Sequence, residues 1–351
     1  DAAAAGGFTG VACMPNTSPV NDSPAITAHI LRAAAARPHA RVHPIACITQ
    51  GMAGEALSEY GALQQAGAVA LSDDGMPVAH SGVLRRAFQY AQHFDLTVIQ
   101  HAEDLTLTGE GVMHEGAVSA RLGLAGIPSQ AEDAMIVRDL MLAEMTGGRY
   151  HVAHLATAGG VEAVRAAKAR DVDATCEVSP HHLLLTDEAV AASGFDTATK
   201  MKPPLRGARD RDALIAGLVD GTIDAIASDH APHHPNEKEH PFGEAPFGIV
   251  GLETTLSLCL DRLVHAGIID LTRLVALLST APARILNLAA GGSLAPGQPA
   301  DVTLIDLDRA VTVDPSRFRS KGRTTPFAGW TLRGAAVGTL LDGRPVILPP
   351  R

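Results

Sequence analysis

Seven short runs rich in valine, isoleucine and alanine recur along this chain of 351 residues, and their spacing restricts its fold more than any other feature. Longer amphipathic segments separate the runs, which is typical of parallel strands that are each followed by a covering helix. The runs are 11–15, 42–49, 69–74, 96–103, 150–157, 172–180 and 223–232. The sequence therefore predicts an α/β fold with a parallel sheet.

The segments between the runs predict the covering helices. The candidates are 24–36, 54–65, 83–93, 131–145 and 159–169. A closed (βα)8 barrel has eight strands, so seven runs behind the helix-like DAAAA opening predict a TIM-type barrel whose first strand would lie upstream of Asp1. An open sheet of seven strands is the alternative.

A change in the pattern of apolar residues and turn residues after Asn287 predicts a small C-terminal β appendage. Short alternating segments are separated there by Gly and Pro turns, as in GGSLAPGQPADVTLIDLD. The sequence LDGRPV predicts a hairpin with Asp342 and Gly343 in its turn. We expect two domains, a metal-dependent hydrolase barrel at 1–286 and a β domain at 287–351.

Composition narrows the class of protein. Hydrophobic residues make up 46% and charged residues 19%, and no apolar stretch is long enough to cross a bilayer. A net charge of -10 argues against a nucleic-acid partner and favours a small-molecule substrate. The four cysteines form no C-x-x-C pair, and the opening lacks the features of a secretory signal, so we expect a cytoplasmic protein.

Acidic residues and histidines gather at the ends of the runs. In a parallel barrel, the C-terminal ends of the strands carry the loops of the active site. The residues at these ends are Asp73, Asp74, His101, Glu103, His154, His181, His182, Asp229, His230 and His233. Because they occupy corresponding places in successive strand–helix units, we expect their side chains to meet at one mouth of the barrel.

This set of side chains suits metal-assisted hydrolysis. Imidazole and carboxylate groups are ligands of Zn²⁺, and a catalytic site keeps one coordination position for water. We expect His101, His154 and Asp229 to hold one metal ion, with Asp74 bridging to a second. A metal-bound hydroxide can attack an unactivated cyclic amide at neutral pH. Asp229 then serves as general base and acid, taking the proton and returning it to the leaving nitrogen.

Each group also has a purely structural interpretation. A single histidine at a strand end, such as His101 or His154, is more often a hydrogen-bonded residue than a ligand. An acidic pair before glycine, as at 73–75, is the sequence of an ordinary turn. For His181 and His182 we favour capping of the barrel mouth by hydrogen bonds over a metal role.

Seven motifs occur in an order that is specific when they are taken together. They are MPNTSP (14–19), SDDG (72–75), QHAED (100–104), VAHLAT (152–157), SPHHLLL (179–185), SDHAPHH (228–234) and APFGIVGLET (245–254). With them the chain closely resembles the class I dihydroorotases of the amidohydrolase superfamily. The likeness runs from end to end and includes KGRTTPFAGWTLRG at 321–334.

The resemblance implies a (βα)8 barrel with a small β domain, one or two zinc ions, and the reversible interconversion of N-carbamoyl-L-aspartate and L-dihydroorotate in de novo pyrimidine biosynthesis. It implies that His101 and His154 ligate one metal. Asp229 would ligate the other metal and act as the general base. Asp74 would bridge the two metals, in preference to Asp73.

The resemblance also implies a substrate pocket. Asn16 and His233 would contact the substrate carboxylate, and the backbone of Pro246, Phe247 and Gly248 would approach the pyrimidine ring.

Two departures from the family pattern affect these expectations. The family opens with a D-x-H-x-H-x-R strand, whose histidines hold the first metal and whose arginine binds the substrate carboxylate. Nothing like that motif appears in this sequence, so the site as written is incomplete, and the chain as given could be inactive for lack of the first-strand ligands. In KMKPPLR (200–206), Lys202 replaces a common asparagine. This lysine could donate to the substrate, alter specificity or be a solvated charge, and we favour the substrate role.

Three further expectations concern relatives and partners. Hydantoinases, dihydropyrimidinases and allantoinases typically bridge their metals with a carboxylated lysine, but no lysine occurs between Asp1 and Ala167, so Asp74 favours a dihydroorotase. A catalytically inactive, dihydroorotase-like partner of aspartate transcarbamoylase is the alternative function, which a count of bound metal would distinguish. The resemblance suggests a homodimer that could assemble with aspartate transcarbamoylase.

Overall fold

A seven-stranded parallel sheet forms the centre of the computed structural model, which describes residues 1–289 and 291–347. In sheet order the strands are β1 (Gly10–Cys13), β2 (Arg41–Ala46), β3 (Ala70–Ser72), β4 (Thr97–Gln100), β7 (Tyr150–Val152), β8 (Ala174–Val178) and β9 (Ala225–Ile226). Every neighbouring pair is parallel. All seven predicted strands are confirmed, and their sequential order is that of a barrel, since a doubly wound open sheet reverses its order part-way.

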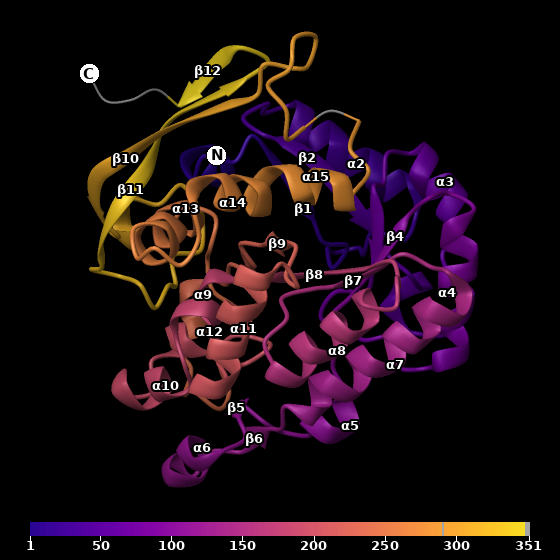
Figure 1. The fold of residues 1–351 in the computed structure, drawn as a ribbon, viewed down its shortest axis with the longest axis horizontal. Coiled ribbons are helices and arrows are strands. Elements are labelled where there is room, and N and C mark those ends of the chain that lie inside the picture. Colours follow the sequence, from indigo (N-terminus) through magenta and orange to yellow (C-terminus); the bar gives the residue numbers. More distant parts are fainter. Residues whose placement is uncertain (290, 348–351) are drawn as a thin grey trace.

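Helices cover the outer face of this sheet. They are α2 (Pro24–Ala35), α3 (Tyr60–Gln65), α4 (Ser81–Gln92), α7 (Gln130–Thr146), α8 (Ala158–Lys168) and α11 (Ala208–Asp220). In Figure 1, α3, α4, α7 and α8 follow one another around the outside of the strands. This arrangement confirms the alternation of strand and covering helix that the sequence predicts.

The prediction for 54–65 was wrong over its first half. Helix α3 begins only at Tyr60, because Gly54 has a left-handed backbone (φ 73°) and Leu57 forms an isolated bridge with Thr49. Both features hold the chain in non-helical conformations before Tyr60.

Shorter elements fill the connections. They are α1 (Ala2–Ala5), η1 (Gln50–Met52), α5 (Leu105–Thr108), β5 (Met113–His114), α6 (Ala117–Leu122), β6 (Gly126–Ile127), α9 (Pro180–Leu184), α10 (Glu188–Ala192), η2 (Thr197–Thr199), α12 (Pro235–Lys238), α13 (Thr255–Cys259), η3 (Leu260–Val264), α14 (Leu271–Val275), η4 (Ala276–Thr280), α15 (Ala281–Ile285) and η5 (Pro315–Arg317). The excursion from α5 to β6, which lies at the bottom of Figure 1, was not predicted from the sequence.

The two faces of the curved sheet bury separate apolar clusters. The larger cluster lies between strands and helices and includes Phe88 and Leu155, both fully buried. The smaller one gathers Ile45, Ile99 and Ala153 from β2, β4 and the end of β7, so these strands curve around a shared interior. Because side chains alternate along a strand, His101, two positions after Ile99, faces the same interior as Ile99.

A three-stranded antiparallel sheet forms the C-terminal appendage. Its strands are β10 (Val302–Thr312), β11 (Thr331–Leu341) and β12 (Arg344–Ile347). The predicted hairpin is confirmed, and its turn residues Asp342 and Gly343 both have positive φ, as a two-residue primed turn requires. The N-terminus lies beside this sheet in Figure 1, where Thr339 Oγ1 donates to Ala4 O over 2.8 Å. Ala290 and residues 348–351 of the predicted appendage lie outside the described residues.

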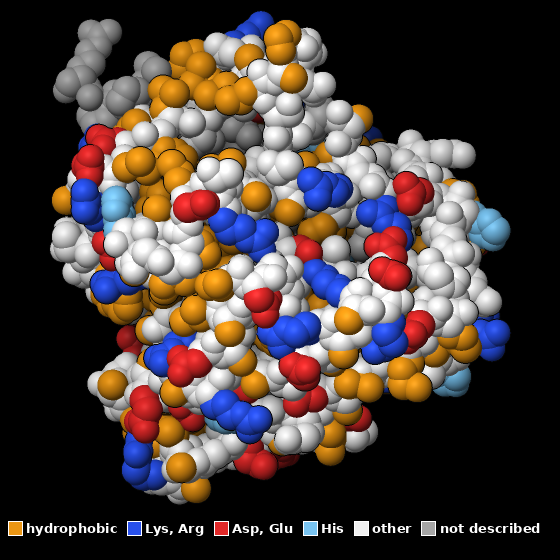
Figure 2. Space-filling model, viewed as in Figure 1, with side chains coloured by type: hydrophobic (Ala, Val, Ile, Leu, Met, Phe, Trp, Pro, Cys, Tyr) orange, Lys and Arg blue, Asp and Glu red, His pale blue; other side chains and the backbone are white. Residues whose placement is uncertain are grey.

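The surface mixes charges of both signs. Lys, Arg, Asp and Glu side chains are interspersed over the lower half of the face in Figure 2, and hydrophobic side chains gather toward its upper left, over the C-terminal sheet. No helix within the described ranges is both long and apolar enough to cross a membrane.

Candidate functional site

Three of the predicted metal ligands meet at the C-terminal ends of their strands. Asp74 follows β3, His101 follows β4 and His154 follows β7, and each offers a ligand atom within 4.8 Å of the other two. His101 Nδ1 and His154 Nε2 are 2.9 Å apart, and His154 Nε2 lies 3.8 Å from Asp74 Oδ1. Two imidazole nitrogens and a carboxylate oxygen form a donor set that fits a divalent metal ion.

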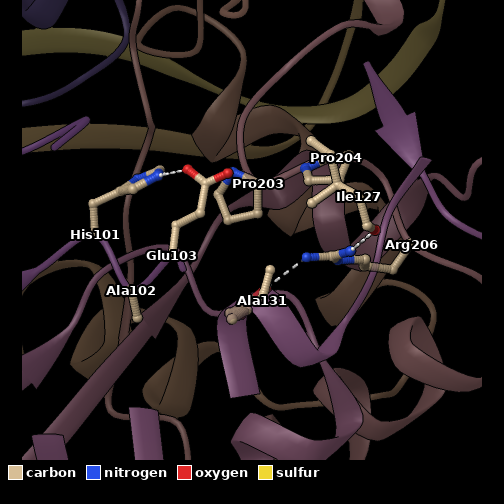
Figure 3. A pocket seen from close by; sticks show the side chains of 9 residues that line it. His101, Ala102, Glu103, Ile127, Ala131, Pro203, Pro204 and Arg206 are labelled. Atoms are coloured by element: carbon tan, nitrogen blue, oxygen red, sulfur yellow. Dashed lines mark hydrogen bonds and ion pairs between the residues drawn. The ribbon is translucent and has the colours of Figure 1, made fainter. Parts of the chain in front are cut away.

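Glu103 orients the ring of His101. The two residues are separated by two positions, and His101 Nε2 lies 3.0 Å from Glu103 Oε2, as Figure 3 shows. Thr108 donates to the other carboxylate oxygen over 2.6 Å. If His101 donates its Nε2 proton to Glu103, the lone pair of Nδ1 faces the metal cluster, which is the usual role of a carboxylate behind a ligating histidine.

The electrostatics of this cluster favour a bound cation. Burial alone would raise the pKa of Glu103, but the hydrogen bonds from His101 and Thr108 and the charge of Lys202 lower that pKa to about 2. Burial opposes protonation of His154, yet the nearby carboxylates, Asp74 foremost, raise its pKa to about 9. Negative charge therefore surrounds the point where the ligand atoms converge.

The fourth predicted ligand, Asp229, follows β9 and faces His181. Its Oδ2 lies 3.4 Å from His181 Nε2, and its charge also acts on His154. Burial would raise the pKa of Asp229, but His181 and His154 hold it well below the usual range. His154 and Asp229 both have positive φ (33° and 45°), a backbone strain that is often found at functional sites. His182 lies 3.0 Å from Pro203 O, in agreement with the capping interpretation.

The neighbouring acids Asp73 and Asp74 have different environments. Asp73 is buried and accepts hydrogen bonds from the backbone N and the Oγ1 of Thr49, and burial raises its pKa to about 6. Asp74 instead faces the histidines. This geometry supports the preference for Asp74 over Asp73 as the metal ligand.

Two of the three predicted substrate-binding side chains, Asn16 and Lys202, lie beside the cluster, and all three already have protein partners. Asn16 Nδ2 donates to Asp74 Oδ2 over 3.1 Å, and Lys202 Nζ lies 3.0 Å from Glu103 Oε2. His233 Nε2 lies 2.8 Å from the carbonyl oxygen of Phe247. A substrate that contacted Asn16, Lys202 or His233 would share or replace these contacts.

Sequence reasoning missed two polar pairs next to the cluster, one of them fully buried. His151, on β7, contacts Glu177 on β8 over 3.2 Å. Arg206 pairs with Glu132 over 3.2 Å and donates to Ile127 O over 2.9 Å, and it lines the small pocket with His101 that Figure 3 shows. The first pair depends on the register of β7 and β8, which pairs His151 with Thr175 and which only the folded structure shows.

Comparisons with known proteins agree with the predicted fold. A family model described as dihydro-orotase-like matches residues 1–159. The dihydroorotase of Syntrophotalea carbinolica is 53% identical over 343 residues, covering 98% of this chain and 80% of that protein. The chain belongs to the dihydroorotase family. The dihydroorotase of Anaeromyxobacter dehalogenans is similar at 55% identity, again over 343 residues, with 98% of this chain and 79% of the relative covered.

A solved structure extends the family assignment to the fold. An L-hydantoinase (dihydropyrimidinase) from Arthrobacter aurescens superposes with a TM-score of 0.88 at 28% identity, covering all of this chain and 79% of its own. The predicted barrel architecture with a small C-terminal sheet is therefore confirmed for this dihydroorotase-family chain. Like its relatives, it is a cyclic amide hydrolase with a candidate metal site.

Proposed function

We propose that this chain carries the dihydroorotase activity of its family, the reversible interconversion of N-carbamoyl-L-aspartate and L-dihydroorotate, with zinc as its metal. The observation that carries the proposal is the convergence of Asp74, His101 and His154 within 4.8 Å at the ends of three strands. A zinc ion bound there would act as a Lewis acid and lower the pKa of a coordinated water.

The protein side chains have separate tasks in this reaction. His101 and His154 hold the metal with Asp74, and Glu103 fixes the orientation and tautomer of His101. Asp229 is ionised, because histidines keep its pKa low, so it can accept a proton and return it to the leaving ring nitrogen.

The substrate's own carboxylate and carbonyl groups need donors. We assign Asn16, His233 and Lys202 to them, and we place the backbone of Pro246–Gly248 against the ring. Asn16 contacts Asp74 of the metal cluster, and Lys202 contacts Glu103, the carboxylate partner of His101; these contacts support the assignment of both side chains to the substrate.

Two aspartate substitutions test the metal assignment. Asp74→Asn should lower the zinc content of the full-length protein and abolish turnover of dihydroorotate. Asp73→Asn is the matched control, since Asp73 contacts Thr49 instead of the histidines, and it should retain both zinc and activity. Zinc per chain by elemental analysis, with a spectrophotometric ring-opening assay, separates these results. Equal zinc content in both variants would refute the role of Asp74.

Asp229→Asn tests the proton transfer. Asparagine tolerates the left-handed backbone of Asp229, so the fold should persist while ring opening stops. Near-normal turnover in this variant would contradict the general-base assignment.

The alternative function is a non-catalytic partner of aspartate transcarbamoylase. The retained ligand cluster favours the enzyme, and a metal count distinguishes the two, because the enzyme should carry one or two zinc ions and the scaffold none. A hydantoinase is the other alternative, and turnover of dihydroorotate but not of hydantoin would exclude it.

The remaining assignments concern assembly. We propose two domains, a barrel at 1–286 and a β domain at 287–351. We also propose that the protein is a homodimer in the cytoplasm and that aspartate transcarbamoylase is a further partner. Light scattering of the full-length protein, alone and mixed with aspartate transcarbamoylase, tests both partners.

A further inference from the structure

Two buried lysines lie beneath the segment Phe242–Gly248. Lys200 is only 2% exposed, and Lys238, at the end of α12, is 7% exposed. Their ammonium groups donate to backbone carbonyl oxygens. Lysine is rarely so buried without a carboxylate, and an apolar side chain would avoid the cost of desolvating the charge. A stabilising role alone therefore explains these residues poorly.

The carbonyl contacts tie down both halves of this segment. Lys200 Nζ donates to Phe242 O over 2.6 Å and to Gly243 O over 3.0 Å. Lys238 Nζ donates to Pro246 O over 2.8 Å and to Gly248 O over 2.9 Å. The backbone closes the arrangement, because Gly248 N donates to Lys200 O over 3.0 Å.

The same segment touches the candidate substrate pocket. The ring centre of Phe247 lies 4.6 Å from Lys200 Nζ and 5.3 Å from Lys202 Nζ, so the ring links the buried lysines to the pocket. The backbone of Gly248 has φ 130°, and a Cβ atom there would come within 3.0 Å of His233 Nε2. The position of this backbone is thus defined closely on the side facing His233.

We propose that Lys238, assisted by Lys200, is a positioning residue that fixes the backbone of Pro246–Gly248 for substrate binding. The proposal rests on the dihydroorotase function proposed above, because that function places the substrate ring against this backbone. Two donors from one ammonium group hold Pro246 O and Gly248 O, the carbonyls on either side of Phe247. Losing them should loosen the segment and weaken binding of the substrate, with little effect on the chemical step.

Lys238→Met tests this in the full-length, zinc-loaded protein. We expect the KM for dihydroorotate to rise about tenfold, and kcat to change by less than about threefold, because binding is lost without loss of transition-state contacts specific to catalysis. Hydrogen exchange should accelerate in peptides from 239–250 and stay unchanged elsewhere. If Lys238→Met does not fold, Lys238→Gln, which keeps an N–H donor, should give a smaller rise in KM and a smaller acceleration of exchange in the same peptides.

Lys168→Met is the matched control. Lys168 is also partly buried and donates to Thr222 O over 2.8 Å, but it contacts Asp224 and not the Phe242–Gly248 segment. It should leave KM and exchange in 239–250 unchanged. An unchanged KM in Lys238→Met, or an acceleration of exchange spread over the whole chain instead of confined to 239–250, would overturn the proposal. If the wild-type protein does not turn over dihydroorotate, the proposed function fails, and the exchange data alone still decide whether Lys238 holds the segment.

Discussion

Replacing Glu103 by glutamine removes one negative charge from behind a metal ligand and preserves the shape of the side chain. Glu103 Oε2 lies 3.0 Å from both His101 Nε2 and Lys202 Nζ, so the carboxylate serves two donors at once. A glutamine carbonyl can still accept from His101, but without the charge. We therefore expect Glu103→Gln to weaken zinc binding and to keep the fold.

The magnitude follows from the two kinds of hydrogen bond. A bond to a charged group contributes about 1.5–3 kcal/mol, against about 0.5–1.5 kcal/mol for a neutral one. The substitution should thus cost about 1–1.5 kcal/mol of metal binding, which corresponds to a rise of roughly fivefold to tenfold in the dissociation constant. Partners behind metal-ligating histidines commonly change metal affinity by about 10–100-fold, so this expectation lies at the lower end.

Competition between the metal-free protein and a chromophoric zinc chelator measures this change. Glu144→Gln is the control, because Glu144 pairs with Arg170 at the surface and lies away from the metal cluster. Its zinc affinity should equal that of the wild type. If Glu103→Gln bound zinc as tightly as the control, the role of Glu103 in orienting His101 would be refuted.

Three other outcomes can be checked with single variants. Lys202→Met should raise the KM for dihydroorotate about tenfold, and Lys202→Asn should raise it less, since the asparagine amide can still donate. Equal KM values for both variants and the wild type would show that Lys202 does not bind the substrate. Leu155→Ala, in the fully buried cluster outside the sheet, should lower the free energy of unfolding by about 2–5 kcal/mol in a urea titration, and a loss below about 1 kcal/mol would show that the core collapses around it. Burial and the charge of Lys200 lower the pKa of Lys238 from 10.5 to about 8, so the unfolded chain holds this proton over a range where the folded chain has released it. The contribution of Lys238 to the free energy of unfolding therefore rises with pH between about 8 and 10.5. In denaturant titrations, the free energy of unfolding of the wild type minus that of Lys238→Met should increase over this range. A difference that stays constant with pH would contradict the lowered pKa.

Strand and helix positions were predictable because they depend on local periodicity. All seven strands of the sheet and four of the five predicted helices occur where the alternation of apolar and polar residues placed them. Helix α3 was the exception, since the left-handed Gly54 and the bridge of Leu57 to Thr49 depend on contacts across a loop.

The candidate ligands were predictable for a different reason. In a parallel sheet whose strands follow one another, residues at the C-terminal ends of strands share one edge, so strand position alone brings Asp74, His101 and His154 together. Their place after successive apolar runs, and the motif resemblance, were both visible in the linear chain.

The partners of these residues were decided only by the tertiary structure. The chain order does not tell that Lys202 contacts Glu103, nor that Lys200 and Lys238 hold the carbonyls of a segment beside the pocket. Hydrogen bonds of long side chains depend on where loops cross after the sheet has curved, and that geometry comes from packing over the whole chain. The sequence by itself determined which side chains stand at the mouth of the sheet, because strand periodicity is local. Only the folded structure decided which of these side chains touch, because contacts depend on how distant segments of the chain pack against one another.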